Sequence, residues 1–259
     1  MIPESPSINQ TIFENIIFNE DCITGMRTRI PDESIDLIVT SPPFNLGIEY
    51  DGYNDDRPYD EYLAWSEEWM QESYRVLKPD GRMCLNQYLS CGTSEFRFGP
   101  IMDLNYIACH QIGFHHHGVG LLNDKTLTKR TAWGSWLSAR APYLNSPYEV
   151  VLVLFKDHWR KDNEGISTIL SKEFQEISMG TWKVQGKIRK EHPAPFPDEV
   201  PRKCIRFLSY QNDIVLDPFM GEGTTAVIAK QERRRYVGFE TSPKYCRKSA
   251  ENLSQELLV

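Results

Sequence analysis

Two short stretches of this sequence carry residue types that suit ligand chemistry, and each follows a short apolar run. Near the C-terminus, the apolar residues 214–216 lead into Asp-Pro-Phe-Met-Gly-Glu-Gly-Thr-Thr at 217–225. The glycines permit a sharp turn and let a ligand approach the backbone closely. Thr224 and Thr225 open a predicted helix, whose first N–H groups suit a carboxylate or a phosphate. Alone, this glycine corner is equally compatible with an ordinary strand-to-helix turn.

The second stretch lies far upstream, where a strand predicted over 34–40 runs into Ser41-Pro42-Pro43-Phe44. Consecutive prolines fix φ and cannot donate to a strand ladder, so the strand must end there in a rigid corner. Such a corner fixes the directions of the Ser41 hydroxyl, the nearby carbonyls and the Phe44 ring. Ser-Pro-Pro is common in loops, but its place between a buried strand and an aromatic residue makes it informative.

The elements that must position these corners alternate between strands and helices. An amphipathic helix is predicted over 58–77, and apolar runs predict strands at 34–40, 82–86, 150–156 and 213–217. The order strand, helix, turn, strand is typical of a parallel sheet in an α/β fold. In such a sheet, ligands bind outside the carboxyl ends of the strands.

Other residues near predicted strand ends are candidate ligand contacts. Glu240 ends a strand about 20 residues past the glycine corner, where a carboxylate can accept hydrogen bonds from ribose hydroxyls. Asp21 follows a strand predicted over 11–18, although a simple turn residue is the commoner role for such an acid. His192-Pro193-Ala194-Pro195-Phe196-Pro197 forms a rigid, extended entry into a helix predicted over 199–209.

Length and composition indicate one large α/β domain over residues 1–259. The chain is 40% hydrophobic and 25% charged, and no apolar run approaches the ~20 residues of a membrane span. The start of the chain lacks the features of a signal peptide. The six cysteines show no CxxC pair, so we expect reduced thiols and a cytoplasmic protein. His115-His116-His117 do not predict a metal site, because adjacent histidines rarely converge on one ion.

Charge is unevenly distributed along the chain. Residues 1–124 carry seven basic and twenty acidic residues, a net of −13, whereas residues 125–206 carry a net of +6. Within 157–190, basic residues alternate with aromatic ones, a composition that suits nucleic-acid contacts. A variable surface insertion is the alternative interpretation. The candidate DNA contacts are Arg160, Lys161, Lys172, Lys183, Lys187 and Arg189.

Taken together, these motifs resemble those of the β class of amino-methylating DNA methyltransferases, the restriction-modification enzymes that modify N4 of cytosine or N6 of adenine. Residues 217–225 resemble the S-adenosyl-L-methionine (AdoMet) motif of that class. Thr40-Ser41-Pro42-Pro43-Phe44 resembles its catalytic motif, and residues 192–197 resemble the segment that precedes its cofactor motif. The order, with the catalytic motif first, is typical of the β class.

The resemblance implies a Rossmann-like AdoMet-dependent methyltransferase sheet, mostly parallel with a reversed last strand and a circularly permuted motif order. It implies no metal, a duplex DNA substrate with a flipped base, and a target-recognition region at about 157–190. Ser41, Pro42, Pro43 and Phe44 would form the catalytic corner. The cofactor contacts would be Asp21, His192, Pro193, Phe196, Asp217, Phe219, Gly221, Gly223, Thr224, Thr225 and Glu240.

Several alternatives remain open from the sequence. Ser41 favours N4 of cytosine, whereas Asn45 resembles the adenine pattern Asp-Pro-Pro-Tyr-Asn. An RNA or protein amino methyltransferase is disfavoured by the Ser-Pro-Pro-Phe motif and by its position before the cofactor motif. A catalytically inactive DNA-binding module is disfavoured by the intact corners. A cognate restriction endonuclease and a homodimer are expected partners, and no membrane partner is expected.

Overall fold

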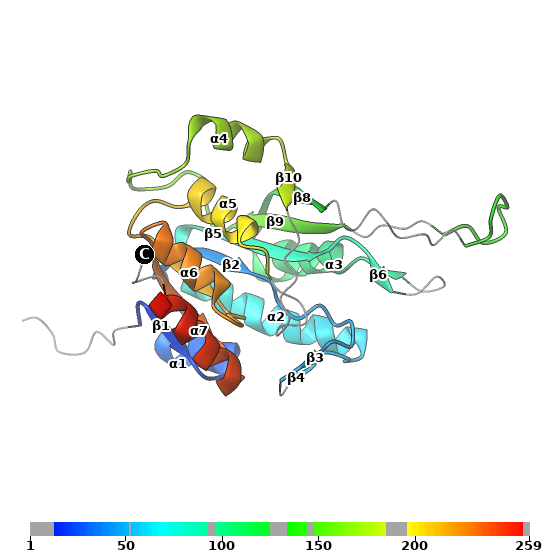
Figure 1. The fold of residues 1–259 in the computed structure, drawn as a ribbon, viewed down its shortest axis with the longest axis horizontal. Coiled ribbons are helices and arrows are strands. Elements are labelled where there is room, and N and C mark those ends of the chain that lie inside the picture. The colour runs from blue at the N-terminus through cyan, green and yellow to red at the C-terminus, as the bar shows by residue number, and fades with distance from the viewer. Residues whose placement is uncertain are drawn as a thin grey trace, which may run out of the picture.

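The structure is a computed structural model that describes residues 13–51, 53–92, 97–124, 134–143, 148–184 and 196–255. Its centre is an eight-stranded sheet with helices on both faces (Figure 1). The strands of this sheet are β1 (Ile16–Phe18), β2 (Ile35–Thr40), β5 (Leu77–Tyr88), β8 (His115–Asp124), β9 (Glu149–Phe155), β10 (Thr181–Val184), β11 (Ile214–Asp217) and β12 (Arg235–Phe239).

The helices are α1 (Cys22–Arg29), α2 (Tyr59–Val76), α3 (Pro100–Tyr106), α4 (Ser171–Ser178), α5 (Glu199–Leu208), α6 (Thr224–Gln231) and α7 (Pro243–Gln255). A π-helical segment, η1 (Ile107–Ile112), continues α3. Two small antiparallel pairs lie outside the main sheet. They are β3 (Glu49–Tyr50) with β4 (Tyr53–Asn54), and β6 (Cys91–Gly92) with β7 (Arg97–Phe98).

The strand order confirms the expected Rossmann-like sheet and its permuted motif order. Across the sheet the order is β1-β12-β11-β2-β5-β9-β8-β10. β9 runs antiparallel to its neighbours β5 and β8, and every other neighbouring pair is parallel. β11, which leads into the glycine corner, comes late in the chain but lies beside β2, which leads into the proline corner.

Helices cover the sheet on two faces because its strands are apolar on both sides. On one face, α1, α2 and α3 pack against residues such as Ile38 and Leu216. On the other, α5 and α6 pack against Leu37 and Val215, the adjacent residues on the same two strands. The two hydrophobic layers hold the strand ends, and therefore both corners, in fixed positions.

Most predicted elements agree with the structure, with informative differences. The helix predicted over 58–77 is α2. The strand predicted at 82–86 is part of the longer β5, which begins at Leu77 and has a register irregularity near its start. Leu77 pairs with Ile35 while Arg82 pairs with Leu37, so extra residues of β5 bulge between these pairs.

Residues 88–148 contribute β8 to the main sheet, and they also contain the β6–β7 pair, α3 and η1. The three adjacent histidines lie on β8, and the His117 ring stacks on Trp159 with ring centroids 3.4 Å apart. Among the described residues, no three His, Cys, Asp or Glu side chains converge to hold a metal ion. Within the same described ranges, no helix combines the length and apolar character needed to cross a membrane.

Candidate active site

The two motif corners lie side by side because the strands that lead into them are parallel neighbours, with Leu216 opposite Ile38. β2 ends at Thr40 and β11 ends at Asp217. Thr40 Oγ1 donates to Asp217 Oδ1 over 2.7 Å, and Thr225 Oγ1 donates to Asp217 Oδ2 over 2.6 Å. One buried carboxylate therefore joins β2, β11 and the start of α6.

Asp217 is a carboxylate enclosed by protein donors. The Phe219 N–H also donates to Asp217 Oδ1, over 3.0 Å. Burial raises the pKa of Asp217 to about 6, although the hydrogen bonds from Thr225, Thr40 and the Phe219 N–H act in the opposite direction. Asp217 lines the cavity described below, and its hydrogen bonds also make it the link that fixes the distance between the corners.

The glycine corner adopts the backbone conformation that its sequence predicts. Gly221 has φ +53° and Gly223 has φ +84°, the left-handed region that favours glycine. The Gly221 N–H donates to Glu240 Oε2 over 2.9 Å, and the Ser242 N–H donates to Glu240 Oε1 over 2.7 Å. A Cβ on Gly223 would lie 2.7 Å from Ser249 Cβ, so this glycine also permits close packing of α7. Burial raises the pKa of Glu240.

The proline corner is held by hydrogen bonds from two directions. Ser41 Oγ lies 3.1 Å from Asn86 Oδ1, to which it donates, and Asn86 Nδ2 donates to the Val150 carbonyl. On the other side, the buried Tyr62 hydroxyl donates to the Pro43 carbonyl over 3.1 Å. Because the Ser41 hydroxyl donates its hydrogen bond to Asn86, the lone pairs of Ser41 Oγ remain available to accept hydrogen bonds from a substrate.

Both corners open into one cavity of about 450 Å³ at the carboxyl edge of the sheet. Phe44, at its wall, meets the Tyr88 ring edge-on with centroids 5.1 Å apart. The structure thus brings together most of the predicted site residues. Those that line the cavity are Asp21, Ser41, Pro42, Pro43, Phe44, Phe196, Asp217, Phe219, Gly221, Thr224, Thr225 and Glu240. His192 and Pro193 lie outside the described residues.

Comparison with known proteins identifies the family. The family model N6_N4_Mtase, described as DNA methylase, matches residues 35–251. This chain belongs to that family. One curated relative, the type II methyltransferase M.MjaVI of Methanocaldococcus jannaschii, is 42% identical over 163 residues, which cover 62% of this chain and 82% of the relative.

Two solved structures agree with the fold of this DNA methylase. One is TTHA0409 of Thermus thermophilus, a putative DNA modification methylase complexed with AdoMet. It has a TM-score of 0.72, 25% identity, and coverage of 93% of either chain. The other is the cytosine-N4-specific PvuII DNA methyltransferase, with a TM-score of 0.69, 22% identity, and coverage of 91% of this chain and 85% of that one. The chain is an AdoMet-dependent DNA methyltransferase of the N4-cytosine or N6-adenine kind.

The cavity of the methylase fits its cofactor, AdoMet. Gly221 lines the cavity and lets the ligand approach the backbone, and Thr224 and Thr225 at the start of α6 line the same space. Gly223, also predicted as a cofactor contact, is not part of this lining and packs against Ser249. Acidic side chains in the lining suit the positive sulfonium and ammonium groups and the ribose hydroxyls. When bound, AdoMet supplies a methyl group that its sulfonium has already activated. The individual contacts of Asp21, Glu240 and the glycine corner stay predictions.

The basic residues predicted to contact DNA fall into different surroundings. Lys183 is exposed on the edge strand β10, Lys172 is exposed on α4, and Arg160 is exposed in the loop after β9. Lys187 and Arg189 lie outside the described residues. DNA contact therefore stays a prediction for all of these residues.

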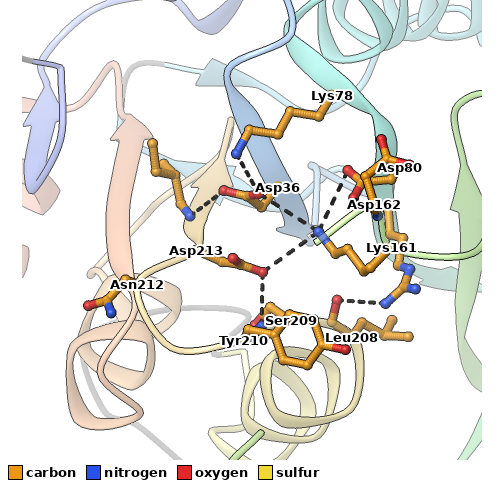
Figure 2. Close-up of polar contacts among 12 residues, drawn as sticks. Asp36, Lys78, Asp80, Lys161, Asp162, Leu208, Ser209, Tyr210, Asn212 and Asp213 are labelled. Carbon is orange, nitrogen blue, oxygen red and sulfur yellow. Dashed lines mark hydrogen bonds and ion pairs between the residues drawn. The ribbon is translucent and has the colours of Figure 1, made fainter. Parts of the chain in front are cut away.

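For Lys161 the structure corrects the prediction. Its side chain is only 8% exposed, and its Nζ lies 3.8 Å from Asp36, 3.9 Å from Asp80 and 3.6 Å from Asp213 (Figure 2). β9 is antiparallel, so the segment after it begins at the amino edge of the parallel strands, opposite the cavity. A lysine surrounded by the carboxylates of its own chain is an internal ion-pair partner, and we do not retain it as a DNA contact.

Several cavity residues were not among the sequence candidates. The residues that follow the proline corner turn around the buried Asp55 carboxylate, which accepts hydrogen bonds from the N–H groups of Asn45, Leu46 and Ile48. Arg57 and the Trp65 ring line the same cavity. The only sequence signal was that this segment directly follows the Ser-Pro-Pro-Phe corner.

Proposed function

We propose that this methylase transfers the methyl group of AdoMet to the exocyclic amino group of a flipped base in duplex DNA. The supporting observation is that the Ser41 hydroxyl and the glycine corner open into one cavity, linked by the Thr40–Asp217–Thr225 hydrogen bonds. A base inside a duplex cannot reach such a cavity, so it must leave the base stack.

The chemistry required of the protein is positioning. The lone pair of an exocyclic amino group is delocalised into the base and is a poor nucleophile. Ser41 Oγ and the Pro42 carbonyl would accept its two hydrogens and direct the lone pair toward the methyl group. We assign the Pro42 carbonyl because the neighbouring Pro43 carbonyl already accepts from Tyr62. Phe44 would stack on the base, supported from the side by Tyr88.

We favour N4 of cytosine over N6 of adenine, on the basis of serine at the first catalytic position. The structure weakens the contrary signal from Asn45. Its side chain donates to the Arg57 carbonyl and accepts from the Arg57 N–H, both over 2.8 Å. Asn45 is not among the described residues that line the cavity. We therefore assign Asn45 a role in shaping the loop and give little weight to its match with the adenine pattern.

Incubation of the protein with labelled AdoMet and unmodified duplex DNA tests the proposal. Nucleoside digestion and mass spectrometry should show N4-methylcytosine. N6-methyladenine as the sole product would overturn the choice of base but not the reaction. A DNA mobility shift without label in the DNA would support the inactive binding module.

Ser41→Ala is the matched variant for the catalytic corner. Loss of one preorganised hydrogen-bond acceptor should lower turnover on the order of 100- to 1000-fold. AdoMet affinity, measured by calorimetry without DNA, should stay within about 2-fold, because the glycine corner is unchanged. Retained turnover would mean that the catalytic corner is misassigned.

DNA recognition and assembly involve parts of the molecule outside the cavity. We propose a single domain with a target-recognition region at about 157–190, in which the exposed Arg160, Lys172 and Lys183 are the described candidates for DNA contact. We also propose a cytoplasmic location, a cognate endonuclease and a homodimer. Methylation sequencing in expressing cells would reveal the recognised sequence, and sedimentation of the purified protein would show whether it dimerises.

A further inference from the structure

Arg57 is the cation of the cavity. Among the described residues that line the cavity, Arg57 is the single lysine or arginine, whereas the acids there are Glu20, Asp21, Asp51, Glu149, Asp217, Glu222 and Glu240. AdoMet brings a sulfonium, an ammonium and one anionic group, the carboxylate of its methionine part. The acids can meet the positive groups, but a carboxylate buried beside them needs a cationic partner.

Both ends of the Arg57 residue are held in place. Its main chain is fixed by the two hydrogen bonds to the Asn45 side chain. Its guanidinium carbon lies 5.1 Å from the centroid of Trp65 and 5.2 Å from that of Tyr53, in cation–π contact with both rings. Arg57 is therefore preorganised, which lowers the entropy cost of binding a ligand.

The rings place Arg57 beside the glycine corner. The Trp65 ring, which carries the guanidinium on one side, lies 5.4 Å from the Phe219 ring, between centroids. Phe219 belongs to the glycine corner, and the resemblance of this corner to the AdoMet motif implies that it lines the methionine end of the cofactor. The guanidinium and the Phe219 ring thus both lie close to the Trp65 ring.

The N–H groups of the Arg57 guanidinium are available to donate hydrogen bonds to a ligand. Within the part of the chain that the structure describes, no hydrogen bond or ion pair involves its N–H groups. By contrast, Arg75, Arg206 and Arg235 each donate to a carboxylate of the chain. Contacts with ring faces leave the in-plane N–H groups of an arginine available for a planar anion.

We propose that Arg57 binds the methionine carboxylate of AdoMet through the in-plane N–H donors of its guanidinium. The assignment rests on the cofactor of this family and is independent of which base is methylated. A phosphate near the flipped nucleotide is the other anion that could approach Arg57. The position beside Trp65 and Phe219 favours the cofactor.

Calorimetry with two ligands separates a carboxylate contact from a structural effect. S-adenosyl-L-homocysteine carries the carboxylate, whereas 5′-methylthioadenosine lacks the whole amino-acid end. In Arg57→Met, which keeps an aliphatic chain against Trp65 and Tyr53, the affinity for S-adenosyl-L-homocysteine should fall about 10- to 100-fold. The affinity for 5′-methylthioadenosine should stay within about 2-fold. Arg57→Lys should restore part of the lost affinity for S-adenosyl-L-homocysteine, because lysine keeps the positive charge but lacks the paired, in-plane donors of a guanidinium.

Arg27→Met is the matched control, since Arg27 is 52% exposed and lies outside the cavity lining. It should change neither affinity. An equal loss for both ligands in Arg57→Met would assign Arg57 a structural role and overturn the proposal. Unchanged affinity for both ligands, with weaker DNA binding and a shallower salt dependence, would assign Arg57 to a phosphate instead. Because these titrations contain no DNA, a wrong choice of base would leave their outcome unchanged.

Discussion

Acidic side chains lie at both edges of the sheet, but they have different partners at each edge. At the amino edge, Lys78 Nζ lies 2.6 Å from Asp36, and Lys161 lies between Asp36, Asp80 and Asp213 (Figure 2). At the carboxyl edge, Asp217 and Glu240 receive hydrogen bonds from hydroxyls and backbone N–H groups. Ion pairs close the first edge, whereas neutral donors leave the second edge negative and open to a ligand.

This contrast shows where the molecule places stability and where it places binding. At the amino edge, internal lysines neutralise the carboxylates, so little negative potential remains to attract a ligand. These ion pairs instead hold neighbouring segments of the chain together. Burial raises the pKa of Asp217 and Glu240, and it also raises the pKa of Asp213 at the amino edge, but only Asp217 and Glu240 line the cavity. A cationic cofactor can offset the cost of burying these two carboxylates. Variants of the carboxyl edge should therefore change affinity, and variants of the amino edge should change stability.

Gly221→Val should give the largest effect at the carboxyl edge. A β-branched side chain at φ +53° is strained by ~1–3 kcal/mol, and it would also occupy the space where the ligand approaches the backbone. Calorimetry with AdoMet should show a loss of affinity of more than about 100-fold.

Gly180→Val is the control for this strain, because Gly180 has φ +69° in the turn before β10 and does not line the cavity. It should lower stability and leave AdoMet affinity unchanged. Near-normal AdoMet affinity in Gly221→Val would show that the glycine corner does not hold the cofactor.

Lys161→Met should lower the free energy of unfolding by about 3 kcal/mol, because it leaves three buried or half-buried carboxylates without their shared cation. Denaturant unfolding measures this loss. AdoMet affinity should stay within about 2-fold at temperatures where the variant is folded.

The exposed Lys172→Met provides the comparison for Lys161, and it should change stability by less than ~0.5 kcal/mol. If Lys161→Met instead weakened DNA binding without loss of stability, the internal role of Lys161 would be refuted and the original DNA assignment restored.

Asp217→Asn should change the dependence of stability on pH. The pKa of Asp217 rises from 3.8 to about 6 on folding, so the folded protein binds more protons than the unfolded chain between these values. The contribution of Asp217 to the free energy of unfolding therefore decreases as pH rises from 3.8 to about 6. The stability difference between the wild-type protein and Asp217→Asn, measured by urea unfolding at several pH values, should change across this window in that direction.

The exposed Asp60→Asn is the control for the removal of one surface carboxylate. A flat difference for Asp217→Asn would indicate that solvent or a ligand relieves the burial of this carboxylate.

Lys183→Ala should have the smallest effect. As one exposed lysine on an edge strand, it can neutralise about one phosphate, so DNA affinity should fall less than about 10-fold and the salt slope should decrease by about 1. Fluorescence anisotropy at several salt concentrations measures both quantities. No change in the slope would place β10 away from the DNA and remove Lys183 from the recognition region.

The corners were predictable from sequence because their information is local. A run such as Ile38-Val39-Thr40 followed by two prolines, or Leu216-Asp217 followed by glycines, specifies a strand end and its turn within a few residues. The strand order supplies the rest, since it makes β2 and β11 neighbours. The mostly parallel sheet and the permuted order followed from the resemblance of these motifs to a known class.

The roles of charged residues were not predictable in the same way. Lys161 and Lys183 were predicted from the same basic and aromatic composition, but one lies near the carboxylates of residues 36, 80 and 213 and the other is exposed. Arg57 is equally ambiguous, because its place in the cavity depends on the Trp65 and Tyr53 rings and on the Asp55 turn. Contacts of this kind depend on tertiary packing, which composition and periodicity do not contain.

The strand order also has a consequence for biosynthesis. β1 is an edge strand whose only partner in the described sheet is β12, and β11 lies between β12 and β2. A ribosome that has made β1 and β2 must add nearly two hundred residues before the strands that separate them emerge. Until then, one side of β2 and the whole of β1 lack sheet partners. Folding should therefore finish late and slowly, and nascent chains truncated before residue 214 should depend on chaperones and be degraded readily.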